Sequence, residues 1–230
     1  VILEIVLSLR NSNHIQKYKY QVPAELEGII NPENHLRASN YNIHKIKSSL
    51  LFGSIELVVF LLWIFGGYLN QLDIWLGSVL QSEFAHGIGV IFLFGFISSL
   101  FAIPETLYAT FVIEEKYGFN RTTLKTWISD FFKSLGLSLV LGLPLIGGIL
   151  WIMNVFSTSW WIIAFALIMS YQLILFFLYP WLIAPLFNKF TPLKEDELTS
   201  RITALGNRMG FTFKNIMVMD ASRRSGHSNA

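Results

Sequence analysis

The sequence predicts an all-α polytopic membrane protein with about five transmembrane helices, the first of them truncated, followed by the start of a small cytoplasmic α+β domain. Of the 230 residues, 53% are hydrophobic and 14% are charged, whereas a typical soluble domain has about 25% charged residues. The mean hydropathy of +0.51 agrees with a membrane protein. Two further observations support this class: several apolar stretches are long enough to cross a bilayer, and the basic residues are confined to alternate loops.

A helix needs about 20 predominantly apolar residues to cross a bilayer core of about 30 Å. We predict such spans at about 50–69, 84–113, 135–153 and 160–187. The apolar segment 1–9 is too short to span and lacks the pattern of a signal peptide, so we interpret it as the inner end of a first helix whose beginning is missing. Pro104 is the expected kink of the long span 84–113.

The Lys and Arg residues assign the two sides of the membrane. All 17 lie within residues 10–50, within residues 114–133 or after residue 187. The connections 70–83 and 154–159 contain none. Because cytoplasmic loops of membrane proteins are enriched in Lys and Arg, we predict that the three basic segments are cytoplasmic and that the tail lies on that side.

The polar segments carry local signals of their own. Asn31 and Pro32 ahead of Glu33 predict a helix start that runs into the second span, and an interfacial helix is the simplest interpretation of residues 31–49. In the tail, four apolar residues at helical spacing precede the helix stop Gly210; they are Leu198, Ile202, Leu205 and Met209. Residues 211–219 follow as a predicted strand.

These signals divide the chain into a membrane region, 1–187, and the beginning of a cytoplasmic domain, 188–230. One amphipathic helix and one strand cannot bury a core alone. We therefore interpret the tail as an incomplete domain.

The sequence excludes several kinds of chemistry. There are no cysteines, so no thiolate site or disulfide can form. The five histidines include no pair four residues apart and no HExxH motif, so we predict no metal site within the chain. The net charge of +2 is too small to indicate nucleic-acid binding. No GxSxG elbow or Gly-rich phosphate loop is present.

Two acidic residues fall inside predicted spans. Glu56 lies one-third into the second span, and Glu105 follows Pro104 in the third. An ionisable residue in a span costs about 2.5–3.5 kcal/mol on insertion scales. The two carboxylates either line a polar chamber between helices or form interhelical pairs, and the sequence leaves both possibilities open.

Three strings in this order and spacing carry a specific resemblance. They are Glu114-Glu115-Lys116-Tyr117-Gly118-Phe119-Asn120-Arg121-Thr122-Thr123, Ile183-Ala184-Pro185-Leu186-Phe187-Asn188-Lys189-Phe190-Thr191-Pro192-Leu193 and Ser222-Arg223-Arg224-Ser225-Gly226-His227-Ser228-Asn229-Ala230. Together with residues 35–41 of the first loop, they resemble the CAAX prenyl endopeptidase family of integral membrane zinc metalloproteases. The resemblance covers nearly the whole chain.

The resemblance implies part of an enzyme that cleaves the C-terminal tripeptide from prenylated CAAX proteins or related peptides. It implies Zn²⁺ in the full-length protein, held by an HExxH helix and a later Glu that should follow Ala230. The 230 residues alone are therefore expected to bind no zinc at that site and to be inactive. Its expected partners are the lipid bilayer and a prenylated or other peptide, with no nucleic acid.

The resemblance also assigns expected roles in the tail. Ser228, Asn229 and Ala230 match an extended strand whose backbone pairs with the bound peptide; a bare chain end is the alternative. Arg223 and Arg224 are expected to form cytoplasmic ion pairs, with acidic groups of the rest of the domain or with lipid headgroups.

A different class of protein fits the same composition. A non-catalytic transporter or scaffold would also have several spans, although a transporter is expected to show repeat symmetry, and none is visible in this sequence. The expected membrane is the bacterial inner membrane, or the endoplasmic reticulum if the source is eukaryotic.

Overall fold

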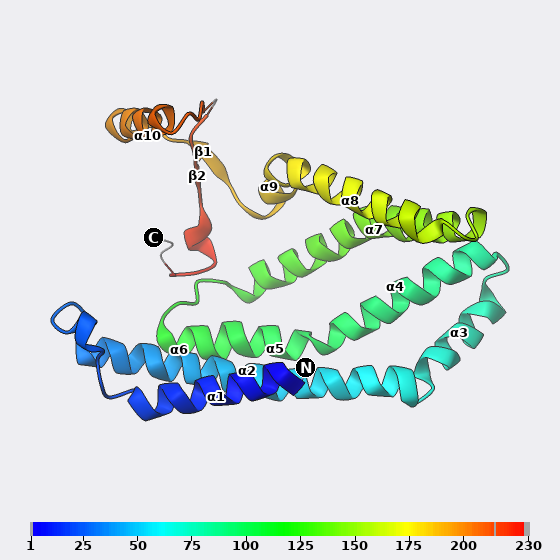
Figure 1. The fold of residues 1–230 in the computed structure, drawn as a ribbon, viewed down its shortest axis with the longest axis horizontal. Helices are drawn as coiled ribbons and strands as arrows, with labels where there is room; N and C mark the ends of the chain where they lie inside the picture. Colours follow the sequence, from blue (N-terminus) through cyan, green and yellow to red (C-terminus); the bar gives the residue numbers. More distant parts are fainter. Residues whose placement is uncertain (1, 214, 228–230) are drawn as a thin grey trace. The chain divides into compact units, whose positions relative to one another are not determined.

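The computed structural model describes residues 2–213 and 215–227, and these form mostly helices (Figure 1). The chain divides into two compact units, residues 1–120 and residues from 121 onward. The first unit contains α1 (Ile2–Tyr18), η1 (Ala24–Leu26), α2 (Pro32–Phe65), α3 (Tyr68–Val79), α4 (Glu83–Phe101), α5 (Ile103–Tyr108), the π-helix η2 (Ala109–Glu114) and α6 (Glu115–Tyr117).

The second unit begins with two long helices and ends with a small mixed segment. Its elements are α7 (Leu124–Val155), α8 (Trp160–Leu178), the π-helix η3 (Tyr179–Ile183), α9 (Ala184–Phe187), β1 (Phe190–Pro192), α10 (Asp196–Arg208), β2 (Met217–Met219) and η4 (Ala221–Arg223). Helices α7 and α8 pack against each other, and the Tyr171 hydroxyl donates to the Leu141 carbonyl over 2.7 Å.

Helix α2 begins at the predicted signal. The Asn31 side chain accepts a hydrogen bond from the Glu33 N–H over 2.9 Å, and Pro32 occupies the first turn, where its missing N–H costs nothing. The helix ends at Phe65, before the predicted span end at 69, because Gly66 and Gly67 follow and Gly67 has a φ of 76°. The predicted connection 70–83 largely belongs to helix α3, which basic-residue counting could not detect.

The helices that contain proline differ in how they respond to it. Between α4 and α5 the helix is interrupted at Ala102, two residues before Pro104, because proline has no N–H to continue the ladder. Pro144 lies inside α7 without ending it. Pro180 lies in the π-helix η3, which joins α8 to α9.

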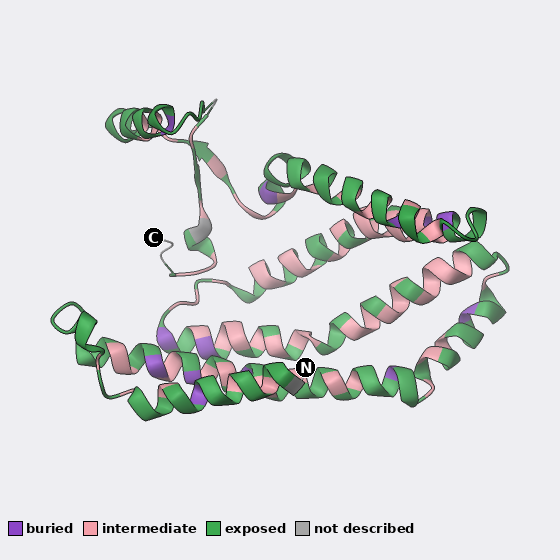
Figure 2. Cartoon of the chain, viewed as in Figure 1, coloured by how far each residue is buried: buried purple, intermediate pink, exposed green. Residues whose placement is uncertain are grey.

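Among the described residues, four helical stretches are long and apolar enough to cross a membrane: Pro32–Phe65, Glu83–Tyr117, Leu124–Val155 and Trp160–Phe187. Their apolar side chains are mostly exposed or half-buried, and Figure 2 shows few buried positions. Exposed apolar surface of this extent is unfavourable in water but suits contact with lipid. The two 34- and 32-residue helices α2 and α7 are about 50 Å long, so they extend beyond the hydrocarbon core.

The segment after α9 has less strand than expected. Strand β2 covers only Met217–Met219 of the predicted 211–219, and it pairs antiparallel with β1, with Phe190 opposite Met219. Strand β1 was not predicted, since three residues are too few for a visible alternation of polar and apolar side chains. Helix α10 and its stop agree with the sequence, since Gly210 follows with a φ of 78°.

Gly118 and Gly142 provide a matched test of the backbone. Gly118 ends α6 with a φ of 79°, and an added Cβ would meet only an Arg37 nitrogen at 3.5 Å. We expect Gly118→Ala to lower the free energy of unfolding by about 1 kcal/mol, because alanine is strained in this conformation. Gly142 lies in helix α7 with open space around it, so Gly142→Ala should raise stability by about 0.5–1 kcal/mol. Unfolding of both variants in detergent checks this, and equal effects would contradict it.

Candidate functional site

A polar cluster in the first unit holds the loop at Glu114–Asn120. The side chains of Arg37 and Tyr41 on α2 donate to the Tyr117 carbonyl and to Glu114, respectively. The Tyr117 hydroxyl and His44 Nδ1 are hydrogen-bonded over 2.8 Å. These bonds tie the C-terminal end of the 83–117 stretch to the polar part of α2.

The electrostatics of this cluster follow from burial and from the neighbouring charges. Tyr41 and His44 lie outside the apolar part of α2, which begins at Leu50. Burial, the hydrogen bond to Glu114 and the charge of Glu114 raise the pKa of Tyr41. Burial lowers the pKa of His44, and the charges of Lys116 and Lys47 lower it further. The cluster therefore keeps a neutral phenol as donor, which suits a fixed structural contact.

The structure brings the two predicted intramembrane carboxylates onto packed helices. Helix α2 carries Glu56 and contacts α5, which carries Glu105. Glu56 is exposed and Glu105 is half-buried. Their role in lining a chamber stays a prediction.

The second unit contains a stronger cluster, centred on Arg224. Its Nε and Nη2 donate to the two carboxylate oxygens of Asp130 over 2.8 and 3.1 Å, and its Nη1 donates to Asn188 Oδ1 over 2.9 Å. Its carbonyl accepts from the Thr122 hydroxyl over 3.0 Å and from the Arg121 N–H over 3.3 Å. A bidentate pair of this kind fixes orientation as well as charge.

This cluster joins parts of all three strings that carry the family resemblance. Arg121 and Thr122 come from the first string, Asn188 from the second and Arg224 from the third. The sequence analysis did not select Asp130, although it is the only acidic residue of α7, and that isolation was the available signal.

Backbone hydrogen bonds also connect the two segments that lead to Asn188 and Arg224, residues 189–193 and 216–220. The Asp220 N–H donates to the Lys189 carbonyl and the Leu193 N–H to the Ile216 carbonyl, each over 3.0 Å. Arg223 makes an exposed contact with Asp220 at 3.9 Å. Arg224 thus pairs with Asp130 of this chain. The sequence analysis had expected its partner in the rest of the domain or among lipid headgroups. The predicted substrate edge Ser228–Ala230 lies outside the described residues.

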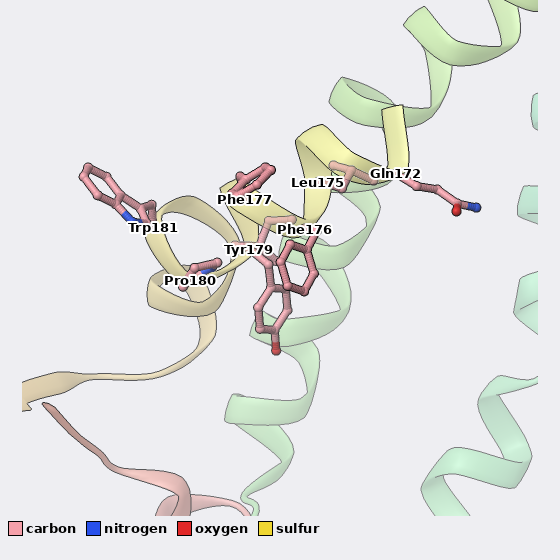
Figure 3. A pocket seen from close by; sticks show the side chains of 8 residues that line it. Gln172, Leu175, Phe176, Phe177, Tyr179, Pro180 and Trp181 are labelled. Atoms are coloured by element: carbon pink, nitrogen blue, oxygen red, sulfur yellow. The ribbon is translucent and has the colours of Figure 1, made fainter. Parts of the chain in front are cut away.

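A hollow of about 660 Å³ flanks the π-helix η3 (Figure 3). In this view the Trp181 side chain points away from those of Phe176 and Tyr179, and it is 87% exposed. Aromatic side chains with this exposure on a membrane-length stretch suit contact with lipid at its interface. The hollow offers no cluster of ionisable groups for chemistry.

Within residues 2–213 and 215–227, no group of three or more His, Asp or Glu side chains could hold a metal ion. The described residues therefore do not form the zinc centre that the resemblance implies. What they offer chemically is a fixed scaffold and a positioned backbone.

Membrane-length helices followed by a short, tightly anchored polar segment define a polytopic helical membrane protein. A family model described as "CAAX prenyl protease N-terminal, five membrane helices" matches residues 11–189. The chain belongs to this family, which confirms the resemblance and the fold class expected from the sequence.

Named relatives agree with this assignment. CAAX prenyl protease 1 of Saccharomyces cerevisiae is 34% identical over 99% of this chain and 52% of its own length. The homolog from Arabidopsis thaliana is 33% identical over 91% of this chain and 51% of its own length. The crystal structure of S. mikatae Ste24p matches with a TM-score of 0.90 at 32% identity, covering 99% of this chain and 55% of that one. The chain thus spans about half the length of these relatives.

Tyr41 tests the first cluster. We expect Tyr41→Phe to lower the free energy of unfolding by about 1.5–3 kcal/mol, because it removes a hydrogen bond to a charged group. Tyr20→Phe is the matched control, since Tyr20 is 72% exposed, and it should change stability by less than about 0.5 kcal/mol. Denaturant unfolding of both variants in detergent gives the comparison, and equal stabilities would show that the bond contributes nothing.

Proposed function

We propose that this chain forms the N-terminal membrane part of a zinc metalloendopeptidase that cleaves the C-terminal tripeptide of prenylated CAAX proteins or related peptides. The names of its relatives, CAAX prenyl protease 1, support a protease of this kind. The observation that carries the proposal is the Arg224 cluster, which joins the three strings typical of the family into one anchored structure.

In this proposal, the long helices form the wall of the enzyme within the bilayer, and the Arg224 cluster positions the segment that follows it. By the family resemblance, Ser228, Asn229 and Ala230 are proposed to pair with a peptide by strand addition. Zn²⁺ would be held by residues other than those described, and would polarise the scissile carbonyl and activate water when bound. The contribution of this chain is to orient the peptide and the neighbouring strand.

We further propose that the tail faces the cytoplasm, since every Lys and Arg lies within residues 10–50, within residues 114–133 or after residue 187, outside the apolar parts of the long helices. The named relatives are eukaryotic proteins, which favours the endoplasmic reticulum over a bacterial inner membrane. The proposed partners remain the bilayer and a prenylated peptide.

Arg224 should be required for efficient cleavage. In the full-length protein, we expect Arg224→Ala to lower the cleavage rate of a prenylated CAAX peptide by about 10- to 100-fold, because small displacements of positioning groups cost this much. Arg223→Ala is the matched control, since its exposed ion pair contributes little. Both variants should be shown to be folded by their unfolding midpoints.

Equal cleavage rates for the folded Arg224→Ala and Arg223→Ala variants would contradict the proposal. Absence of chelator-sensitive cleavage in the unmodified full-length protein would instead favour a non-catalytic membrane protein.

Orientation can be measured independently of activity. A reporter fused after Lys194 should report the cytoplasm, and one inserted at Gly77 should report the opposite side of the membrane. The same compartment at both positions would contradict the proposed topology.

A further inference from the structure

A groove in the first unit has a cationic end and an apolar end. It lies between α2 and the stretch from α5 to α6, and its volume is about 390 Å³, which falls within the range of roughly 300–1,000 Å³ for small-ligand sites. Neither Glu56 nor Glu105 lines it, and none of the described residues that do is acidic.

Two lysines approach the cationic end from opposite walls. Lys47 comes from α2 and Lys116 from α6, and both line the groove. Burial lowers the pKa of His44, and the charges of both lysines lower it further. Its Nδ1 is hydrogen-bonded to the Tyr117 hydroxyl. Two lysines lining one groove, with no acidic residue among its described lining residues, create a place where an anion is favoured.

Ser48 supplies an independent sign of a ligand. It lines the groove next to Lys47, and only 8% of its surface is exposed. Its hydroxyl is buried and has no hydrogen-bond partner among the described residues. A buried hydroxyl without a partner costs free energy, and an acceptor oxygen bound beside it would remove that cost.

The other end of the groove is apolar. Leu51 and Phe52 lie one turn further along α2, and Val112 and Ile113 face them from the π-helix η2. Since the apolar part of α2 begins at Leu50, the lysines lie at the level where the hydrocarbon core gives way to headgroups. The lining of the groove thus changes from charged to apolar along its length, as the bilayer does from headgroups to hydrocarbon core.

We propose that this groove binds one anionic phospholipid. Its phosphate lies between Lys47 and Lys116 and accepts a hydrogen bond from Ser48, and an acyl chain runs along Leu51 and Val112. Basic pockets between membrane helices recognise lipid headgroups through this combination of charge and depth. The groove is a lipid site in addition to the proposed protease function.

The charge requirement can be tested on the purified chain in detergent. Native mass spectrometry would measure retention of phosphatidylserine and of phosphatidylcholine. We expect preferential retention of phosphatidylserine, and its affinity should fall roughly 10- to 30-fold in Lys47→Gln/Lys116→Gln, given the attraction of each lysine for anionic lipid. The matched control is Lys17→Gln/Lys19→Gln, which removes the same charge from the same unit outside the groove.

Ser48→Ala separates a binding role from a structural one. It should weaken phosphatidylserine binding while leaving the unfolding midpoint of the lipid-free chain unchanged or higher, since the hydroxyl has no partner to lose. Inorganic phosphate at millimolar concentration should not displace the lipid.

Three results would overturn the proposal. They are equal lipid retention by the two double-lysine variants, unchanged binding by Ser48→Ala, and complete displacement by inorganic phosphate, which would indicate a soluble phosphate as the ligand.

Discussion

The hydrogen bonds of Arg224 hold together segments that are distant in sequence. Its guanidinium binds Asp130 on α7 and Asn188 after α9, and its carbonyl binds the loop that precedes α7. Hydrogen bonds to charged groups contribute about 1.5–3 kcal/mol each, and here both charged side chains are mostly shielded, with 28% and 22% exposed. Loss of Arg224 would leave the Asp130 carboxylate without its bidentate partner and with Lys133 at 3.7 Å.

The hydrogen bonds of Arg224 also explain why the short segment after α9 adopts a defined structure. Strands β1 and β2 have three residues each, too few to be stable as an isolated hairpin. Their pairing is supported on one side by the Arg224 cluster and by the Asp220–Lys189 backbone bond. In the first unit, Arg37, Tyr41 and His44 perform an equivalent task for the loop at Glu114–Asn120.

Hydropathy and charge predicted the membrane class and the long helices because the bilayer imposes a length and a polarity that are local in sequence. The start of α2 and the end of α10 were predictable for the same reason, since caps depend on adjacent residues. Helix α3 was missed because it lies in a connection judged only by its lack of basic residues.

The sites were less accessible to sequence reasoning. Arg224 was selected, but its partners Asp130 and Asn188 lie 94 and 36 residues away, and no local pattern links them. The proposed lipid groove likewise depends on Lys47 of α2 and Lys116 of α6, which are distant in sequence and line the same groove. Glu56 and Glu105 were found from their cost in a span, and the structure places them on contacting helices.

A double-mutant cycle between Arg224 and Asp130 tests the central claim most directly. The free energy of unfolding would be measured for the chain, for Arg224→Ala, for Asp130→Ala and for the double variant. The account predicts a coupling energy of about 1.5–3 kcal/mol, as expected for residues in one charged hydrogen-bond network. Additive effects, with a coupling energy near zero, would contradict it.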